Sequence, residues 1–370
     1  MSKQLKSIAL FPLQVTRHSI FVFSAILDFC RSNSIDVRYR IPRNRILSTQ
    51  NDGIVVAVFE SPNHNELTVG FDMGDYPHIA SIEGLDLCDI YVKRSYDSSL
   101  LSSLPSGYRQ KVVPLGMYHA CSPKQPFAET HLILSACVGA ASLGISAFRK
   151  TLVNTTRLLV RSAFGRQAAF PMVDRFRQLR SIGQQTVFFH TRIWDPNIHK
   201  SFYGRNIREV NAFRKSLVSA LRDNLGEKFI GGIIENDYAR RDCPDLISSH
   251  SADFSTYMNL LKNSRIAITE TGLHASTGSR LPEYFAAGRC IVSEPLEFEI
   301  PIPPTDGIEW HTYQDVDSCM EVCIDLLNDI VSVDSAMTKA ATYYDQHVMP
   351  EKQIETLITR IGTAITSDRN

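Results

Sequence analysis

The sequence lacks the motifs that mark the commonest metal, redox and hydrolase sites. Its eight cysteines form no CxxC pair, which excludes a zinc knuckle and a thioredoxin-type motif. HExxH, GxGxxG and GxSxG are also missing, so nothing indicates a zinc metalloprotease, a dinucleotide fingerprint or a hydrolase nucleophile elbow. Positive and negative charges cancel to a formal net charge of zero, so no overall charge favours nucleic acid as a partner.

The sequence also lacks segments suited to export or to membrane insertion. The apolar run near its start is too short for a signal peptide. No apolar run reaches the roughly 20 residues that are needed to span a bilayer. Cysteines scattered without pairing are typical of a reducing compartment. These absences predict a cytoplasmic protein.

What is present is typical of a large folded protein. The chain has 370 residues, which suits two domains better than one core. Hydrophobic residues make up 44% and charged residues 21%, close to the averages of globular proteins. We divide the chain into an α/β lobe over residues 1–128, a helical stretch over 129–182, a second α/β lobe over 183–335 and C-terminal helices over 336–370.

Strands alternate with helices in both lobes. An amphipathic helix over residues 17–32 lies among β-rich runs at 7–13, 36–41, 53–59, 67–71, 89–93 and 111–114. The second lobe has strands at 185–190, 228–234, 265–269 and 289–293, with helical stretches between them. This order predicts a mostly parallel sheet in the first lobe and a doubly wound, Rossmann-like sheet in the second.

A basic, amphipathic region lies between the lobes, over residues 149–180. Asp174 is its single acid, against Arg149, Lys150, Arg157, Arg161, Arg166, Arg175, Arg177 and Arg180. Two interpretations stay open. The region makes peripheral contact with anionic lipid, or it is a solvated helix face whose apolar side packs on its own domain.

The most informative segment is the loop that follows the strand at 265–269. Small and hydroxyl residues fill this loop, and the helix after it has Pro282 in its first turn. Glycines let backbone N–H groups approach an anion closely, and a helix N-terminus adds favourable partial charge. The carboxylate of Glu283 is placed to accept hydrogen bonds from both hydroxyls of a ribose. The residues expected to bind a nucleotide diphosphate here are Thr271, Gly272, His274, Ser276, Thr277, Gly278, Ser279, Arg280 and Glu283.

With an Ala-Ala-Gly turn and a short strand after Glu283, this segment resembles the donor-site signature of GT-B glycosyltransferases, especially the group 1 superfamily. The resemblance implies two facing Rossmann-like lobes with a cleft between them, phosphate contacts from the loop and a ribose contact from Glu283. It also implies that the last helix, at 351–365, returns to the first lobe. Many retaining members carry a second acid eight positions before the ribose glutamate, where this chain has Ala275. Retention and inversion of the anomeric configuration therefore both stay open.

A second match to this family opens the C-terminal lobe. Arg192 follows the strand at 185–190, and Lys200 lies in the loop beyond it. GT-B transferases often place a basic pair here, facing the donor diphosphate, whose oxygens a guanidinium binds bidentately. Arg192 is the stronger candidate, because the family spacing places the lysine nearer Asn197. The alternative is that Arg192 pairs with Asp195 as surface structure.

The first lobe is expected to supply the acceptor site and the base. Asp72, Asp75 and His78 lie where a predicted strand meets a loop, the kind of place at which active groups of α/β sheets collect. We predict Asp72 or Asp75 as the base, with His78 in reserve. Lys93 and Arg94 end another strand and are candidates for binding a charged sugar or a lipid-linked phosphate. The alternatives are that the first three are turn residues and that the two cations balance nearby aspartates.

The combined prediction is a metal-independent glycosyltransferase without a cofactor. It moves a sugar from a nucleotide diphosphate to a hydroxyl of a glycan or lipid-linked acceptor, in cell-surface polysaccharide synthesis. Asp315 and Asp317 form a DxD pair, but they open a predicted helix and are interpreted as a cap rather than as a metal site. A sugar-nucleotide 2-epimerase of the same fold and a non-catalytic glycan- or nucleotide-binding module stay open as alternatives.

Overall fold

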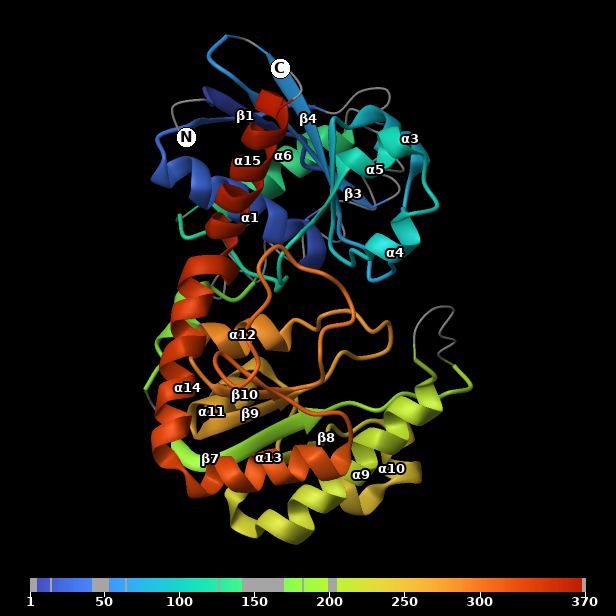
Figure 1. Cartoon of the computed structure of the whole chain (residues 1–370), viewed down its shortest axis with the longest axis vertical. Helices are drawn as coiled ribbons and strands as arrows, with labels where there is room; N and C mark the ends of the chain where they lie inside the picture. Colours follow the sequence, from blue (N-terminus) through green and yellow to red (C-terminus); the bar gives the residue numbers. More distant parts are fainter. Residues whose placement is uncertain are drawn as a thin grey trace. The chain divides into compact units, whose positions relative to one another are not determined.

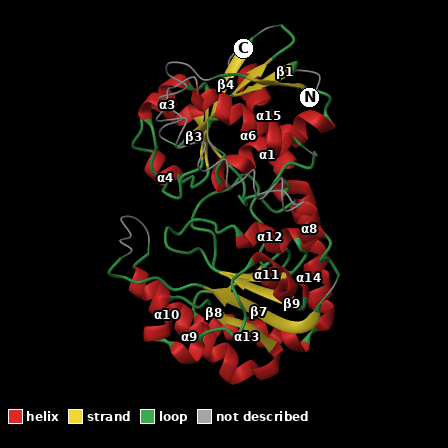
Figure 2. Cartoon of the chain, turned by 180° about the vertical axis from the view of Figure 1, so that it is seen from behind, coloured by secondary structure: helices red, strands yellow, loops and turns green. Residues whose placement is uncertain are grey.

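The computed structural model describes residues 5–13, 15–41, 53–63, 65–125, 127–141, 170–181, 183–198 and 205–367. The chain forms two compact units, each with its own sheet and helices (Figure 2). The first comprises Met1–Val173, Glu299–Ile302 and His347–Asn370, and the second Asp174–Phe298 and Pro303–Gln346. The predicted class, α/β with two lobes, is confirmed. That the lobes face each other across a cleft stays a prediction.

The sheet of the first unit has six strands and one reversal. Its order is β2 (Asp36–Tyr39), β1 (Ser7–Leu10), β3 (Ile54–Glu60), β4 (Glu66–Asp72), β5 (Ile90–Lys93) and β6 (Val112–Pro114). β3 runs antiparallel to both of its neighbours, and the other pairs are parallel. The reason is the connection from β3 to β4 at residues 61–65, which suffices for a hairpin but is too short for a parallel crossover. The sheet is thus mostly parallel, as predicted, with one reversed strand.

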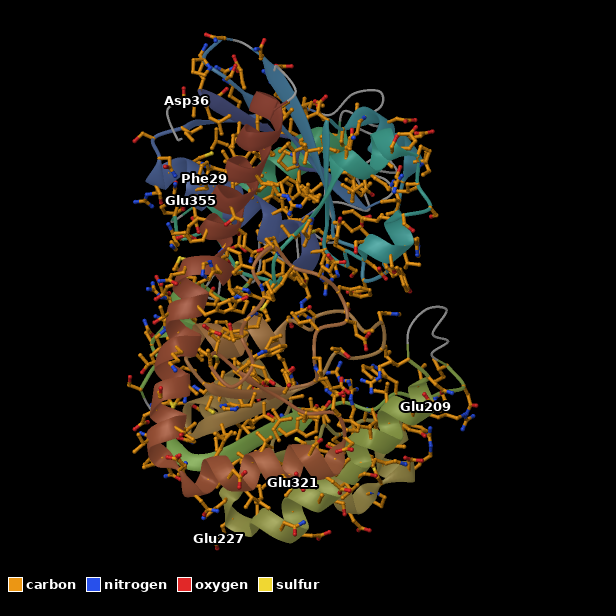
Figure 3. All side chains as sticks on the ribbon, in the orientation of Figure 1. Phe29, Asp36, Glu209, Glu227, Glu321 and Glu355 are labelled. Carbon is orange, nitrogen blue, oxygen red and sulfur yellow. The ribbon has the colours of Figure 1, made fainter. Side chains whose placement is uncertain are left out.

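Helices cover this sheet and bring the end of the chain back to it. They are α1 (Arg17–Ser32), α3 (Ile82–Leu87), α4 (Ser98–Leu101), α5 (Ser106–Lys111), α6 (Ala128–Ala141) and α15 (Pro350–Ser367). A capping box between Thr16 and Ser19 starts α1. α15 packs along α1, and Figure 3 labels Phe29 and Glu355 on these two helices. The last helix, for which a return to the first lobe is predicted, thus belongs to the first unit.

The second unit is a parallel, doubly wound sheet. Its order is β11 (His311–Thr312), β10 (Cys290–Ser293), β9 (Ser264–Thr269), β7 (Gln184–Thr191) and β8 (Phe229–Ile233). The four strands predicted for this lobe are present, each within one residue of its predicted ends. β8 and β9 lie on opposite sides of β7, so the strand order reverses there. Such a switch point is where open α/β sheets bind ligands, beyond the carboxyl ends of the strands.

Helices cover both faces of this sheet. α9 (Ile207–Leu225) and α13 (Val316–Asn328) lie on one face, and α11 (Phe254–Lys262) and α12 (Arg280–Ala286) on the other (Figure 1). Glu209 of α9 and Glu321 of α13, labelled in Figure 3, are exposed. The remaining elements are α8 (Val173–Arg177), α10 (Asp237–Asp242), α14 (Ile330–Tyr343), short 3₁₀ turns at Gly226–Lys228 and Pro244–Leu246 and a π turn at Tyr344–Val348. Among the described residues, no helix is both long and apolar enough to cross a membrane.

Alternation along the strands explains this two-sided packing. Val187 and Phe189 of β7 pack into the core that α9 and α13 cover. Phe188, between them in sequence, meets the aromatic rings of Tyr257 and Tyr284 from α11 and α12. Successive side chains of a strand point to opposite faces, so apolar side chains cover both faces of the sheet.

Asp315 caps α13 through the backbone N–H of Ser318, which confirms its interpretation as a cap.

Candidate functional site

The carboxyl ends of β7, β9 and β10 gather the polar groups of the second unit. β7 ends in His190 and Thr191, β9 continues into Glu270, and β10 continues into Glu294. The predicted phosphate loop, residues 271–279, joins β9 to α12 at this same edge. The structure thereby brings the predicted loop to the switch point of the sheet.

Two residues of this loop have clear structural tasks. Thr271 donates from its backbone N–H and from its hydroxyl to Oε2 of Glu294, at 2.9 Å each. Arg205 binds the same carboxylate at 2.6 Å, and its backbone N–H donates to Leu273 at 3.1 Å. Gly272 has a φ of +73°, where a side chain would strain the backbone. The loop is therefore held at its first residues, before it reaches α12.

The remaining candidates of the loop precede α12 or lie in its first turn. His274, Ser276, Thr277, Gly278 and Ser279 follow one another toward the helix. Ser279 is the N-cap of α12 but makes no side-chain cap hydrogen bond, and α12 has only seven residues. Their predicted contacts with phosphate stay predictions.

Glu283, the predicted ribose ligand, has a partner that the sequence did not indicate. The hydroxyl of Tyr257, from α11, donates to Oε2 of Glu283 at 2.6 Å. The guanidinium of Arg280 lies over the Tyr257 ring, 5.7 Å from its centroid. Burial alone would lower the pKa of Arg280, but the neighbouring tyrosines and carboxylates raise it on balance. The three side chains place a permanent cation beside a carboxylate whose direction is fixed.

His190 is a second residue that sequence reasoning missed. It is 1% exposed at the end of β7, and its Nε2 has no hydrogen-bond partner among the described residues. Burial, followed by the charges of Arg280, His250 and Arg192, lowers its pKa to about 4. The imidazole is therefore neutral at pH 7, with a buried nitrogen beside cationic groups. Its place two residues before Arg192, at a strand end, was the available signal.

Arg192 itself is exposed just beyond β7. In the described part of the chain, Asp195 pairs with Arg241, at 3.3 Å, and not with Arg192. The alternative in which Asp195 neutralises Arg192 is thus not what the structure shows. Lys200, the weaker member of the predicted pair, lies outside the described residues.

A buried ion pair supports the same edge from the α9 side. Arg214 of α9 pairs with Glu270, and both side chains are at most 7% exposed. The hydroxyl of Thr191 donates to Oε1 of Glu270 at 2.9 Å, and the Arg214 guanidinium lies 4.2 Å from the centroid of the Trp194 ring. Arg214 also donates to the carbonyl of Arg192. This cluster fixes the backbone from which the Arg192 side chain projects.

In the first unit, the carboxylate of Asp72 is buried in hydrogen bonds and an ion pair. It is 1% exposed and accepts hydrogen bonds from the Tyr91 hydroxyl at 2.8 Å and from the backbone of Gly74 and Ala80 at 3.0 and 3.2 Å. Lys93, opposite Asp72 in the parallel pairing of β4 and β5, is also 1% exposed and lies 3.1 Å away, Nζ to Oδ2. These are the contacts of a structural carboxylate, and they do not favour Asp72 as the base. For Lys93, the alternative of balancing an aspartate describes its contacts better than acceptor binding.

Asp75, Arg94 and two aromatic residues form a neighbouring, more accessible cluster. Arg94 pairs with Asp75 at 2.6 Å and lies over the Tyr118 ring, 4.3 Å from its centroid. His18, in the first turn of α1, stacks on Tyr118 with centroids 5.2 Å apart. Burial and then Arg94 lower the pKa of His18, while Asp75 opposes the shift. Sequence reasoning missed His18, because its closeness to Asp75 arises only when α1 packs beside the strand ends.

His78, held in reserve as a base, stacks on the ring of Tyr76. The ring centroids are 5.4 Å apart, with an angle of 17° between the planes. The structure therefore places Asp75 in an ion pair and His78 in a ring stack. Their catalytic roles stay predictions.

One cavity of about 400 Å³ opens at the opposite edge of the second sheet. Its charged lining residues neutralise one another, since Arg180 pairs with Asp345 at 2.7 Å and Arg265 with Asp334 at 2.8 Å. Arg265 lies near the start of β9, so this cavity adjoins the amino ends of the strands. It is separate from the candidate site at the carboxyl ends.

No protein-family model matches the chain, and no curated protein matches it. Among solved structures, it is similar to a glycosyltransferase from Rickettsia africae, with 13% identity, a TM-score of 0.41, and 92% of this chain and 80% of that chain covered. It is also similar to HepE from Anabaena in complex with UDP, at 9% identity and a TM-score of 0.36, over 95% and 98% of the two chains. A third is the C-terminal domain of LpcC, a group 1 glycosyl transferase family protein from Francisella tularensis, at 10% identity and a TM-score of 0.30, over 47% and 91%.

Proposed function

We propose that this protein is a glycosyltransferase that takes a sugar from a nucleotide diphosphate and transfers it to a hydroxyl of a glycan or lipid-linked acceptor, without a metal or cofactor. The observation that carries the proposal lies at the switch point of the second unit. There, Arg280 lies beside Glu283 and Tyr257, while an exposed Arg192 and a buried neutral His190 end β7. Cations for a diphosphate and a carboxylate for a ribose thus converge on one sheet edge.

The donor diphosphate is the group on which negative charge grows when the sugar leaves. Guanidinium groups bind such oxygens in charge-assisted, bidentate pairs, which can replace a metal as the stabiliser of the leaving group. Arg280 and Arg192 are our candidates for this task. The hydroxyl and backbone groups of residues 276–279 would add further donors, and Glu283 would accept from the ribose hydroxyls.

The first unit is proposed to bind the acceptor and to supply the base. A base must be able to take a proton at pH 7 and must reach the acceptor hydroxyl. His18 is our first candidate, because its lowered pKa leaves the imidazole neutral and Asp75 is close enough to stabilise the charge that it would gain. Asp75 and His78 follow, and Asp72 comes last because of its burial.

The test is a product assay with a panel of sugar nucleotides, run in EDTA with and without candidate acceptors. A transferase releases nucleoside diphosphate in an acceptor-dependent way, and Glu283→Ala and Arg280→Met should each lower this release by about 100-fold or more. A donor that is isomerised without release of diphosphate would instead indicate the 2-epimerase. Nucleotide binding without any turnover would indicate the non-catalytic module.

We also propose a cytoplasmic protein that touches anionic membrane surfaces, as enzymes with lipid-linked acceptors must. The predicted basic contact at 149–180 lies mainly outside the described residues. One described feature supports it. α6, which directly precedes residues 142–169 with their five Arg or Lys and no acid, exposes Leu134 at 50% and Val138 at 58%.

The membrane contact can be tested by sedimentation with anionic phospholipid vesicles. Leu134→Asp should weaken binding severalfold, and so should the combined removal of charge at Arg157, Arg161 and Arg166. Val331→Asp, at a residue of α14 that is 75% exposed, is the matched control and should bind as the wild type does. Equal sedimentation of all variants would overturn the proposed contact.

A further inference from the structure

The hydroxyl of Tyr257 lies near the proposed donor site and has no role in the donor chemistry proposed above. It comes from α11, an element outside the loop and helix that carry the other donor residues. Its hydrogen bond to Oε2 of Glu283, at 2.6 Å, joins it to the predicted ribose ligand. A phenol buried only for packing does not need its oxygen there, since Phe would fill the same space.

We propose that Tyr257 is a positioning residue, whose hydroxyl fixes the Glu283 carboxylate for the ribose hydroxyls and so makes the site select ribonucleotides over 2′-deoxyribonucleotides. This inference rests on the proposed function, because it takes Glu283 as the ribose ligand. It adds a residue and a specificity to the proposed donor site.

The ring of Tyr257 is held firmly enough to do this. Its centroid lies 6.1 Å from that of Phe188 on β7 and 6.2 Å from that of Phe254 on α11. α11 itself begins at a firm cap, where Asp253 accepts from the backbone N–H of Thr256 at 2.9 Å. Because a tyrosine has only two side-chain torsions, a clamped ring also fixes the position of its oxygen.

The fixed hydroxyl matters because Glu283 has a competing partner. Arg280 and Glu283 attract each other electrostatically. A carboxylate free to swing toward Arg280 would neutralise the proposed phosphate ligand and abandon the ribose at the same time. The hydrogen bond from Tyr257 opposes this movement. It persists at physiological pH, because burial and Glu283 raise the pKa of Tyr257 well above 10 and keep the hydroxyl protonated.

The test compares affinities for pairs of ligands that differ by one hydroxyl. Calorimetry on the full chain measures Kd for each ribonucleoside diphosphate and for its 2′-deoxy counterpart. A charge-assisted hydrogen bond to the missing hydroxyl predicts that the wild type favours the ribonucleotide by about 10- to 100-fold. Tyr257→Phe keeps the ring and should weaken ribonucleotide binding about 5- to 10-fold. It should weaken deoxyribonucleotide binding by a smaller factor, because the 2′-deoxy ligand keeps only one of the two hydroxyls that Glu283 would bind.

Three further variants separate positioning from packing. Glu283→Gln changes the acceptor of the same hydrogen bond from a carboxylate to an amide and should also reduce the preference for ribose. In Glu283→Ala the preference should vanish, and adding Tyr257→Phe should then change nothing more, because the two act through one contact. Tyr238→Phe is the matched control and should behave as the wild type. It removes a hydroxyl that donates to Asp242 at 3.2 Å within α10 of the same unit.

The outcomes are distinguishable. A folded Tyr257→Phe variant with an unchanged ratio of ribonucleotide to deoxyribonucleotide affinity would overturn this inference and leave the proposed function standing. Additive effects of the two substitutions on that ratio would overturn it as well. Failure of the wild type to bind any nucleoside diphosphate would overturn the proposed function, and this inference with it.

Discussion

The buried pair of Asp72 and Lys93 gives the sharpest stability prediction. Each side chain is 1% exposed, and Nζ lies 3.1 Å from Oδ2. Asp72→Asn removes the countercharge of Lys93, whose pKa burial already lowers although Asp72 opposes that shift. Removing one partner of a buried ion pair typically costs about 3–5 kcal/mol, because the other charge stays buried without compensation.

The structure supports the upper part of that range for Asp72→Asn. Asp72 accepts three hydrogen bonds besides its ion pair, and those from Gly74 and Ala80 fasten the loop after β4. An amide turned toward Lys93 and Tyr91 cannot accept all of them. At about 2–4 °C per kcal/mol for a unit of this size, a loss of about 4–5 kcal/mol should lower the melting temperature of the first unit by roughly 8–20 °C.

Differential scanning calorimetry of the wild type and four variants checks this prediction. Lys93→Met should destabilise the first unit by a similar amount, since it leaves the carboxylate buried alone. The double variant should lose at least about 1.5 kcal/mol less than the sum of the single variants, because the partners are coupled. Asp86→Asn is the control and should cost under about 1 kcal/mol. It also removes a carboxylate that accepts from a tyrosine, Tyr108, but at an exposed site.

Two results would contradict the structural role of the Asp72–Lys93 pair. Additive effects of Asp72→Asn and Lys93→Met would show that the pair is not coupled. A stable Asp72→Asn variant that loses turnover with donor saturating would return Asp72 to the role of base. The structure leads us to expect the reverse, an unstable variant whose folded fraction still turns over.

Three further predictions concern other parts of the chain. Asp28, on α1, is 4% exposed, and burial raises its pKa from 3.8 to about 7, so the folded state keeps a proton that the unfolded chain loses. The free energy of unfolding that Asp28 contributes should therefore fall by up to about 4 kcal/mol as pH rises from about 4 to 7. The urea midpoint of Asp28→Asn should rise relative to that of the wild type across this range, and a constant difference between the two midpoints would contradict the prediction. Gly231→Ala should prevent folding of the second unit, because the added Cβ would lie 2.0 Å from the Phe189 carbonyl oxygen. Gly226→Ala, whose Cβ meets open space, is the milder comparison. A native circular dichroism spectrum of Gly231→Ala would contradict this prediction. His190→Phe should keep the fold and weaken diphosphate binding, measured by calorimetry, by about 10-fold through loss of its buried nitrogen; unchanged affinity would exclude His190 from the site.

The sequence predicts the elements of the second unit better than those of the first. Strand runs such as 265–269 have an apolar centre, here Ile266 to Ile268, and are bounded by loops, which is the pattern of a strand buried on both faces. In the first unit, the runs at 53–59 and 67–71 are just as clear, but their relative direction depends on the loop between them. Periodicity carries no information on direction, so only the length of that loop pointed to a hairpin.

Some residues of the candidate site could likewise be predicted from the sequence, and others could not. The loop at 271–279 and Glu283 could be read from one continuous segment, because their chemistry follows from local spacing. Tyr257 could not, since its role depends on a hydrogen bond to Glu283 that only the fold creates. For His190 the sequence offered only its place at a strand end, and its burial and lowered pKa come from the fold.

Asp72 and Lys93 show that the ends of neighbouring strands have to be considered together. From the sequence we predict a separate function for each and keep charge balance with a nearby aspartate as the alternative for Lys93. Parallel strands that end together place their last residues side by side, which favours that alternative. Two opposite charges at matching strand ends thus indicate a pair before they indicate two sites.

The central claim is that the second unit binds a nucleotide diphosphate at the carboxyl ends of its strands. A thermal-shift screen of UDP, GDP, CMP, dTDP and their sugar conjugates, with and without EDTA, tests it most directly. We expect a rise in melting temperature for one nucleotide that survives EDTA and disappears in both Glu283→Ala and Arg280→Met. No shift with any nucleotide, or a shift that both variants retain, would contradict it.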